Sequence, residues 1–256
     1  MEKRFEGKVA LVTGPASGIG RATALGFARE GANVLVADVA VDGGEETVRM
    51  IKDLGADAAF VKADVSVDAE VAEMVAEAVD RFGGLDIAVN NAGIEGALAP
   101  TADYPEEIWE RVIAINLTGV WRSMRYEIPE LLKRGGGAIV NVASILGVVG
   151  FANAPAYTAA KHGVVGLTKV AAMEYAPQGI RINVVGPGFI ETPMVMERGV
   201  EAGKHPEVQK QIAELHPIGR MGKAEEIADA ILFLASEQAT FVAGHSLIVD
   251  GAYTAR

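Results

Sequence analysis

The stretch 9–20 has the sequence VALVTGPASGIG, an apolar run followed directly by a glycine-rich turn. The run Val9–Thr13 is typical of a buried strand, and the residues from Gly18 onward have the pattern of a helix. Glycines at 14, 18 and 20 let the backbone approach a pyrophosphate, and the helix N-terminus offers free N–H groups to it. The spacing Gly-x3-Gly-x-Gly differs from the common G-x-G-x-x-G. It predicts a dinucleotide site, the alternative being an ordinary turn between strand and helix.

An acid at the end of the second apolar run specifies the dinucleotide further. Asn33–Asp38 (NVLVAD) places Asp38 18 residues after Gly20. A carboxylate at this position accepts hydrogen bonds from both ribose hydroxyls of NAD and repels the 2′-phosphate of NADP. The sequence therefore predicts NAD as the cofactor, unless Asp38 is a surface residue that caps the next helix.

Apolar runs and amphipathic segments alternate along the whole chain. This pattern predicts an α/β fold, a doubly wound parallel seven-stranded sheet with helices on both faces, in a single domain over 1–256. The long stretch from Gly186 to Met221 is expected to be irregular and contains four prolines. Such a stretch favours a substrate lid at about 190–216. The expected strands are Val9–Thr13, Asn33–Asp38, Ala58–Val61, Leu85–Asn90, Gly137–Ala143, Arg181–Val185 and Ser246–Asp250, and the expected helices are 18–30, 43–54, 68–82, 105–134, 156–176 and 224–235.

The composition excludes several function classes. The chain has 256 residues, half of them apolar, and a net charge of −11, which argues against nucleic acid and membrane surfaces as partners. It has no cysteine, and its start Met1–Lys8 has no signal-peptide character, so we expect a cytoplasmic protein. The four histidines have no metal-ligand spacing, so no metal site is predicted.

A second motif carries chemistry rather than binding. Tyr157 and Lys161 are spaced i, i+4 in a helical pattern, so the phenol and the ammonium lie on one helix face. Alone, this pair also fits a solvated helix face. Ser144 strengthens it, because it ends the fifth strand, where a parallel sheet places ligand-contacting residues.

Together these motifs resemble the short-chain dehydrogenase/reductase family over essentially the whole chain. The family's T-G-x-x-x-G-x-G is Thr13–Gly20, its acid after the third strand is Asp64, and its N-N-A-G is Asn90–Gly93. The resemblance implies active-site roles for Asn116, Ser144, Tyr157 and Lys161. It also implies cofactor contacts at Gly14, Ser17, Gly18, Ile19, Gly20, Asp38, Asp64, Val65, Asn91, Ala92, Gly93, Tyr157, Lys161, Pro187, Gly188, Ile190 and Thr192, although Asn91 is interpreted as a structural turn residue rather than a catalyst.

The resemblance implies a hydride transfer between NAD and a secondary alcohol or its ketone. Ser144 and Tyr157 bind the substrate oxygen, and Tyr157 is the acid/base. A tyrosine ordinarily has a pKa near 10, so the Lys161 ammonium is expected to stabilise the phenolate and to hold the nicotinamide ribose. Asn116 is expected to position a water that links Lys161 to solvent. The family also implies a homotetramer that pairs through the helices at 105–134 and 156–176. Small residues at Gly163, Gly166, Ala171 and Ala172 permit that approach, unless they face the sheet.

The substrate is expected to be a small neutral molecule, a cyclic or short aliphatic alcohol. Besides Lys161, no cation near the motifs is an evident partner for an anion, and acids at Glu95, Glu191, Glu197 and Glu201 disfavour one. Two alternatives are a 3-oxoacyl thioester reductase and a non-catalytic NAD-sensing module. The first typically prefers NADPH, for which Ser17 and Val39 supply no cation, and the second needs no Ser144, Tyr157 and Lys161 together. The expected pocket lining is Ile94, Ile145, Leu146, Phe189, Met194 and Met196.

Overall fold

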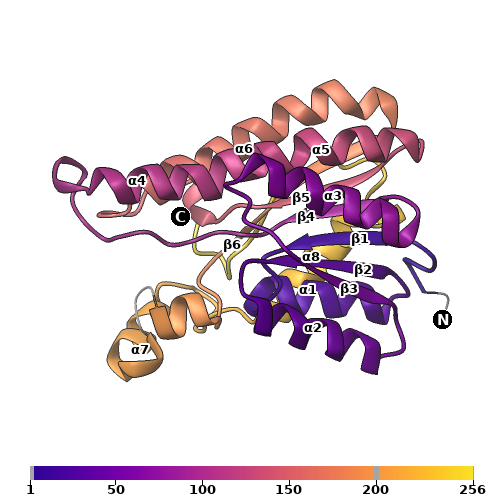
Figure 1. Ribbon diagram of the computed structural model, residues 1–256. Coiled ribbons are helices and arrows are strands. Elements are labelled where there is room, and N and C mark those ends of the chain that lie inside the picture. Colours follow the sequence, from indigo (N-terminus) through magenta and orange to yellow (C-terminus); the bar gives the residue numbers. More distant parts are fainter. Residues whose placement is uncertain (1–2, 199–201, 256) are drawn as a thin grey trace.

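A computed structural model describes residues 3–198 and 202–255 and contains one seven-stranded sheet (Figure 1). The strand order is β3-β2-β1-β4-β5-β6-β7, and all neighbours pair in parallel. The predicted fold class is confirmed, and strand ends differ from the predicted ones by two residues at most. The strands are β1 Val9–Thr13, β2 Asn33–Asp38, β3 Ala58–Lys62, β4 Ile87–Asn90, β5 Gly137–Val142, β6 Ile180–Pro187 and β7 Ser246–Val249.

Helices cover both faces of the sheet, and each face has its own apolar core. In Figure 1, α1, α2 and α8 lie against one face, and α3, α5 and α6 lie against the other. Strands buried on both faces are apolar almost throughout, which explains their sequence pattern. The helices are α1 Gly18–Arg29, α2 Val41–Asp53, α3 Asp68–Phe82, α4 Glu106–Ile113, α5 Gly119–Lys133, α6 Pro155–Tyr175, α7 Pro206–Glu214 and α8 Ala224–Ala235. Among the helices described, none combines the length and hydrophobicity needed to cross a bilayer.

The strand order reverses direction at β1, which pairs with β2 on one side and β4 on the other. In such sheets the crevice beyond the carboxyl ends at this switch point binds ligands. The glycine-rich turn after β1 and the segment Asn91–Gly93 after β4 both open into that crevice.

The helix predicted over 105–134 extends from Glu106 to Lys133, but a π-helical turn lies within it. Residues Ala114–Thr118 form this turn between α4 and α5. It contains Asn116, whose amide Nδ2 donates to the Ile94 carbonyl at 2.7 Å and whose Oδ1 accepts from the Ile94 N–H at 2.9 Å. π-turns inside α-helices occur frequently at functional sites. Periodicity alone does not reveal one, because the apolar pattern continues on both sides.

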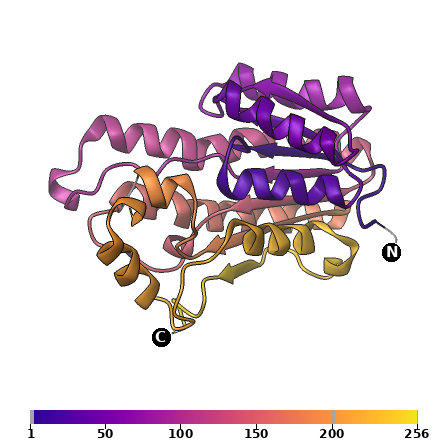
Figure 2. The same ribbon diagram turned by 90° about the horizontal axis from the view of Figure 1, so that it is seen from below.

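The stretch 186–221, predicted to be irregular, is partly regular. Strand β6 extends to Pro187, and helix α7 starts at Pro206. Proline at the first helical position costs no hydrogen bond, so Pro206 begins a helix rather than breaking one. Short helical turns at Met194–Arg198 and Ala202–Lys204 precede α7. Figure 2 shows this part of the chain, in orange, apart from the helices that cover the sheet.

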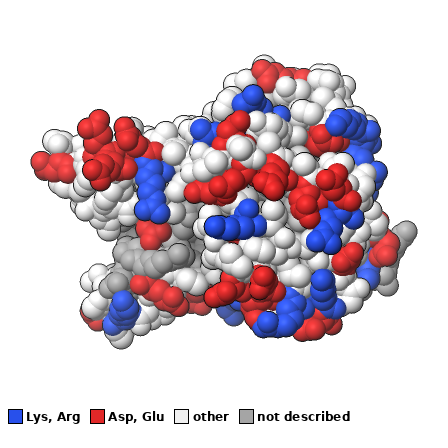
Figure 3. Space-filling model, in the orientation of Figure 1, with Lys and Arg blue, Asp and Glu red and all other residues white. Residues whose placement is uncertain are grey.

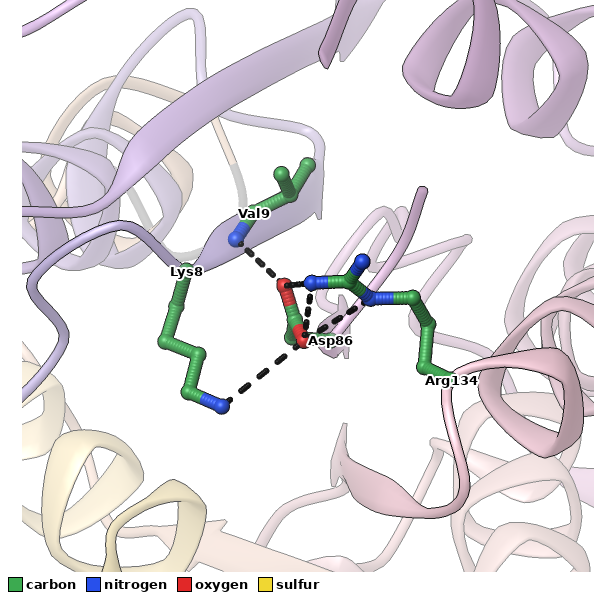
Figure 4. A network of polar contacts seen from close by, with 4 residues as sticks. All are labelled: Lys8, Val9, Asp86 and Arg134. Carbon is green, nitrogen blue, oxygen red and sulfur yellow. Dashed lines mark hydrogen bonds and ion pairs between the residues drawn. The ribbon is translucent and has the colours of Figure 1, made fainter. Parts of the chain in front are cut away.

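The amino end of the sheet contains a compact polar network (Figure 4). The Asp86 side chain is 9% exposed and accepts the N–H of Val9 at 2.9 Å. The same carboxylate pairs with Arg134 at 3.2 Å and Lys8 at 3.8 Å. These contacts join the starts of β1 and β4 to the end of α5, so this edge is stabilised by groups that satisfy one another.

Candidate active site

The glycine-rich turn is a close-packed cradle. Gly14 has φ +71°, a conformation that favours glycine, and a Cβ there would lie 2.9 Å from Cα of Ala92. The amide of Asn91 holds the turn, because its Nδ2 donates to the carbonyls of Thr13 at 2.9 Å and Gly14 at 3.2 Å. A Cβ on Gly20 would collide with the Gly14 carbonyl. The turn therefore leaves backbone N–H groups accessible, as a phosphate site requires.

Asp38 contacts this turn directly. Its Oδ2 accepts the N–H of Ala16 at 2.8 Å, and its Oδ1 accepts that of Ala40 at 2.9 Å. The carboxylate thus fixes the glycine-rich turn and the approach to α2. Each oxygen retains a second lone-pair direction that suits a ribose hydroxyl. The helix-capping alternative and the ribose-binding role are therefore compatible.

A groove runs across the carboxyl ends of β1, β2, β3 and β4 and fits a dinucleotide. The N-terminus of α1 opens into it. The side chain of the N-cap residue Ser17 accepts no hydrogen bond from the backbone N–H groups of this helix. The groove is lined by the predicted residues Gly14, Ser17, Gly18, Ile19, Gly20, Asp38, Asp64, Val65, Asn91, Ala92, Gly93 and Thr192.

Among the groove residues that sequence reasoning missed are Arg111 and Ile115, one helical turn apart. Arg111 is exposed and borders the dinucleotide groove, whereas Lys161 borders the pocket beside Tyr157. That Lys161 is the one evident cationic partner for a substrate carboxylate or phosphate stays a prediction. The helix pattern at 105–134 placed Arg111 on a helix but gave no indication that this face meets the groove. Ile115 had a signal, because it directly precedes Asn116.

Ser144 and Tyr157 meet in an adjoining pocket. The Ser144 Oγ accepts the N–H of Leu146 at 3.1 Å, which orients the hydroxyl, and Ser144 also forms a hydrogen bond to the Tyr157 phenol. Burial raises the pKa of Tyr157 to about 12. The hydrogen bond with Ser144 lowers this pKa and the charge of Glu95 raises it, but both effects are smaller than that of burial. Tyr157 is therefore a neutral phenol in this state of the protein.

Lys161 lies beside the Tyr157 ring, with Nζ 5.4 Å from the ring centroid. Its ammonium donates to the Val142 carbonyl at 2.8 Å, and burial lowers the pKa of Lys161 to about 8. Burial, Ser144 and Glu95 determine the pKa of Tyr157 in this structure, so the expected lowering of that pKa by Lys161 stays a prediction. A Cβ on Gly93 would lie 3.8 Å from Lys161 Nζ and 3.2 Å from Asn116 Oδ1, so these side chains flank one point.

The pocket beside Tyr157 is mainly apolar. Of the expected lining, Ile145, Leu146, Phe189 and Met194 are present, and Val195 joins them. Ile94 lines the dinucleotide groove instead, and Met196 packs against the Ile212 and Met221 cluster. Pro187, Gly188, Ile190 and Thr192 also border the pocket.

The acids and histidines near the site have differing environments. Glu95 is half-buried, whereas Glu191 and Glu197 are exposed, and Glu201 lies outside the described residues. His162 is exposed and its Nδ1 bonds to the Thr158 carbonyl, whereas His216 is buried. Over 3–198 and 202–255, no group of three His, Asp or Glu side chains has the geometry of a metal site.

The arrangement resembles the site of a nicotinamide-dependent oxidoreductase: a glycine-rich turn at a helix N-terminus, an acid at the end of β2 and a half-buried phenol beside an ammonium. Residues 14–254 match a family model described as enoyl-(acyl carrier protein) reductase. The chain belongs to the short-chain dehydrogenase/reductase family.

Relatives match over nearly their full lengths. Cyclohexanol dehydrogenase of Acinetobacter sp. (strain SE19) is 47% identical over 100% of this chain and 98% of its own. Cis-4-hydroxycyclohexanecarboxylate dehydrogenase of Sinomonas cyclohexanicum is 46% identical over 100% of both chains. The crystal structure of levodione reductase superposes with a TM-score of 0.95, at 38% identity over 98% of this chain and 99% of its own.

Further relatives bear on the cofactor and on the alternative function. A 3-oxoacyl-[acyl-carrier-protein] reductase of Thermotoga maritima is 41% identical over 97% of this chain and 98% of its own. An NAD-bound xylitol dehydrogenase has a TM-score of 0.93 at 34% identity, covering 97% of this chain and 100% of its own. An NADP-bound putative 2-deoxy-D-gluconate 3-dehydrogenase from Agrobacterium tumefaciens has a TM-score of 0.90 at 38% identity, covering 100% of this chain and 99% of its own. Neighbours of this fold therefore bind nicotinamide cofactors of both kinds.

Proposed function

We propose that this protein is an NAD-dependent dehydrogenase of neutral secondary alcohols, with Tyr157 as acid/base. The observation that carries the proposal is the placement of the hydrogen-bonded Ser144 and Tyr157 at the wall of an apolar pocket, next to a groove suited to a dinucleotide. A non-catalytic NAD-binding module has no need of this hydroxyl pair. It also has no need of an ammonium 5.4 Å from the phenol ring.

The catalytic roles follow from the positions of the side chains. Ser144 donates a hydrogen bond to the substrate oxygen. Tyr157 accepts the alcohol proton as a phenolate in oxidation, and as a phenol it donates its proton to the ketone oxygen in reduction. Bound in the groove, NAD supplies the hydride acceptor and a positively charged ring. That charge opposes the effect of burial on Tyr157. Lys161 adds to it when its ammonium turns from the Val142 carbonyl toward the phenol, and Asn116 supports the same region through Ile94.

Asp38 supports NAD over NADP. A 2′-phosphate would meet this carboxylate, while the neighbouring Ser17 and Val39 provide no compensating cation. Arg111 lines the groove too, but from α4, across from the β2 end that carries Asp38. Its exposed guanidinium can therefore attract the phosphates that NAD and NADP share, and it does not distinguish between the two cofactors.

The pocket supports a compact neutral substrate, such as a cyclic alcohol. Its lining beside Tyr157 is apolar, and the half-buried Glu95 repels an anion placed near the phenol. Cyclohexanol, the substrate named for one relative, is a neutral ring alcohol of this kind, and a second relative is named for a cyclohexane ring that also bears a carboxylate. We propose that the segment 190–216 closes over this pocket as a lid, its residues 199–201 lying outside the described structure.

A 3-oxoacyl thioester reductase is the second candidate, because a relative with that name is 41% identical. Acyl carriers are acidic proteins, and Figure 3 shows acidic side chains gathered over the α4 end of this molecule. Glu106, Glu107 and Glu110 are exposed there. Repulsion between like charges disfavours such a partner.

We also propose that the enzyme is a cytoplasmic homotetramer. An apolar strip on α6, formed by Val170 (54% exposed) and Met173 (81% exposed), lies on the face of the exposed Gly166. Trp121 of α5 is 46% exposed and extends the apolar surface of these helices. Gly163 packs against Leu117, and Ala171 and Ala172 are buried in the core, so of the four small residues only Gly166 is open to a partner helix.

The deciding experiment measures kcat/KM for cyclohexanol, cis-4-hydroxycyclohexanecarboxylate and a 3-oxoacyl thioester, each with both cofactors. We expect the neutral alcohol and NAD to be preferred. The variant Asp38→Ala with Val39→Arg should move the cofactor preference toward NADP and leave the order of substrates unchanged. Equal efficiency with NAD and NADP in the wild type would contradict the cofactor assignment. A preferred thioester would contradict the substrate class.

A further inference from the structure

Phe189 is the residue at which the catalytic pocket meets the proposed lid. Its ring borders the pocket that contains Tyr157. It packs against the Ile145 and Leu146 cluster on one side and against the Ile212 and Met221 cluster on the other. Any displacement of Phe189 therefore changes the shape of the space beside the phenol.

The backbone around Phe189 is fixed by main-chain partners, with one exception. The Gly188 N–H donates to the Val249 carbonyl at 3.0 Å, the Phe189 carbonyl accepts from Gly222 at 2.9 Å, and the Glu191 N–H donates to the Gly222 carbonyl at 2.9 Å. The Phe189 N–H instead donates to a side chain, Nε2 of His216, at 3.2 Å.

His216 is adapted to this one contact. It lies just beyond α7, is 2% exposed, and its Nδ1 donates to the Ile212 carbonyl at 2.9 Å. Because an N–H can only donate, Nε2 must be the acceptor, so both bonds require the neutral ring with its proton on Nδ1. The imidazole also packs edge-on against the Phe189 ring, at 5.8 Å and 89°, and against Tyr253 at 5.4 Å.

We infer that His216 is a positioning residue: by accepting the Phe189 N–H it ties α7 to the pocket wall and sets the position of the Phe189 ring against the substrate. This inference deepens the proposed function and rests on it. The main chain of Pro187 and Gly188 pairs with β7, although Nε2 of His216 also lies against Gly188, 2.9 Å from the position of a Cβ there. Loss of the His216 contact should therefore weaken binding of the alcohol more than binding of the cofactor.

Two isosteric changes separate the two hydrogen bonds of His216. In His216→Asn, the amide nitrogen takes the place of Nδ1 and retains the Ile212 bond, but the side chain is too short to reach Phe189. In His216→Gln, the amide oxygen reaches the place of Nε2 and accepts the Phe189 N–H. Since an unpaired buried N–H is costly, we expect a KM for the alcohol about tenfold higher in the Asn variant.

The same experiment measures kcat and the NADH dissociation constant by fluorescence titration, and both should stay within about twofold of wild type. The Gln variant should restore the wild-type KM. His205→Asn is the matched control, since His205 lies on the same segment with its side chain 52% exposed. A wild-type KM in His216→Asn, or a KM in His216→Gln as high as in His216→Asn, overturns the inference.

Phe189→Leu tests the same idea even if His216→Asn does not fold. It retains the backbone N–H and the His216 bond but removes the ring, so the KM for the alcohol should rise while NADH binding persists. An unchanged KM in Phe189→Leu overturns the inference without affecting the proposed function. A wild-type enzyme that oxidises no secondary alcohol overturns the proposed function, and this inference with it.

Discussion

The two ends of the parallel sheet contain polar side chains in opposite situations. At the amino end, Asp86 binds Val9, Lys8 and Arg134, so the carboxylate has a partner on every side (Figure 4). At the carboxyl end, Tyr157 and Lys161 lie beside an apolar pocket. Burial raises the pKa of Tyr157 and lowers that of Lys161, so it favours the neutral form of each. Satisfied polar groups stabilise a fold. Groups with perturbed pKa values indicate a functional site when they also border a ligand pocket, as Tyr157 and Lys161 do.

The largest effect is expected from removing the phenol hydroxyl of Tyr157. Tyr157→Phe keeps the ring and its packing but loses the transferable proton. We expect turnover to fall by at least ~10²–10⁴-fold, with NADH binding and thermal stability retained. Near-wild-type turnover in steady-state assays would remove Tyr157 from the mechanism. Asp86→Ala serves as the control, because it should lower thermal stability and leave turnover unchanged.

A buried carboxyl group lies between the two ends of the sheet. Glu127 of α5 is fully buried, and its Oε2 accepts from Nδ2 of Asn90 at 3.0 Å. Desolvation raises the pKa of Glu127 from 4.5 to about 8. The same Asn90 nitrogen also donates to Asn141 at 2.9 Å, so the carboxyl belongs to a network that joins β4, β5 and α5.

This raised pKa predicts how stability depends on pH. Below pH 4.5 both the folded and the unfolded chain keep the Glu127 proton. Between pH 4.5 and about 8 only the unfolded chain releases it, so the free energy of unfolding should fall through this window, by on the order of 5 kcal/mol. Glu127→Gln should lose this part of the pH dependence in urea denaturation, with kcat unchanged. Parallel pH profiles for variant and wild type would show that Glu127 is ionised in the folded protein.

Asp86 is the corresponding test at the amino end. Asp86→Ala leaves the Val9 N–H unpaired and two cations without their acid, so we expect the free energy of unfolding to fall by about 2 kcal/mol. The cost is limited because the Lys8 and Arg134 side chains are 49% and 42% exposed. Denaturation curves measure the loss, and kcat/KM of the folded fraction should be unaffected. A parallel loss of kcat/KM would mean that the two ends are coupled.

The sequence predicted the strands better than it predicted the packing and the electrostatics at the carboxyl end of the sheet. Val9–Thr13 and Asn33–Asp38 were predicted to the residue, since buried parallel strands and glycine-rich turns depend on local pattern. The π-turn around Asn116 and the groove contact of Arg111 depend on tertiary packing, which no local pattern contains. The same is true of the raised pKa of Tyr157, because burial decides it. Helix α7 was missed because Pro206 resembled a loop residue rather than a first helical residue.

The smallest expected effect concerns Glu95, the counterpart of Asp86 at the carboxyl end. Among the described residues Glu95 has no ion pair or hydrogen bond, yet it acts on Tyr157 through its charge. A substrate carboxylate near the phenol would be repelled by about 1 kcal/mol at partly solvated separations. Glu95→Gln should therefore raise kcat/KM for cis-4-hydroxycyclohexanecarboxylate about fivefold relative to cyclohexanol. Glu191→Gln, on the exposed start of the lid segment, is the control and should leave the ratio unchanged. An unaltered ratio in Glu95→Gln would mean that the apolar wall alone selects the neutral substrate, and that the charge of Glu95 has no part in it.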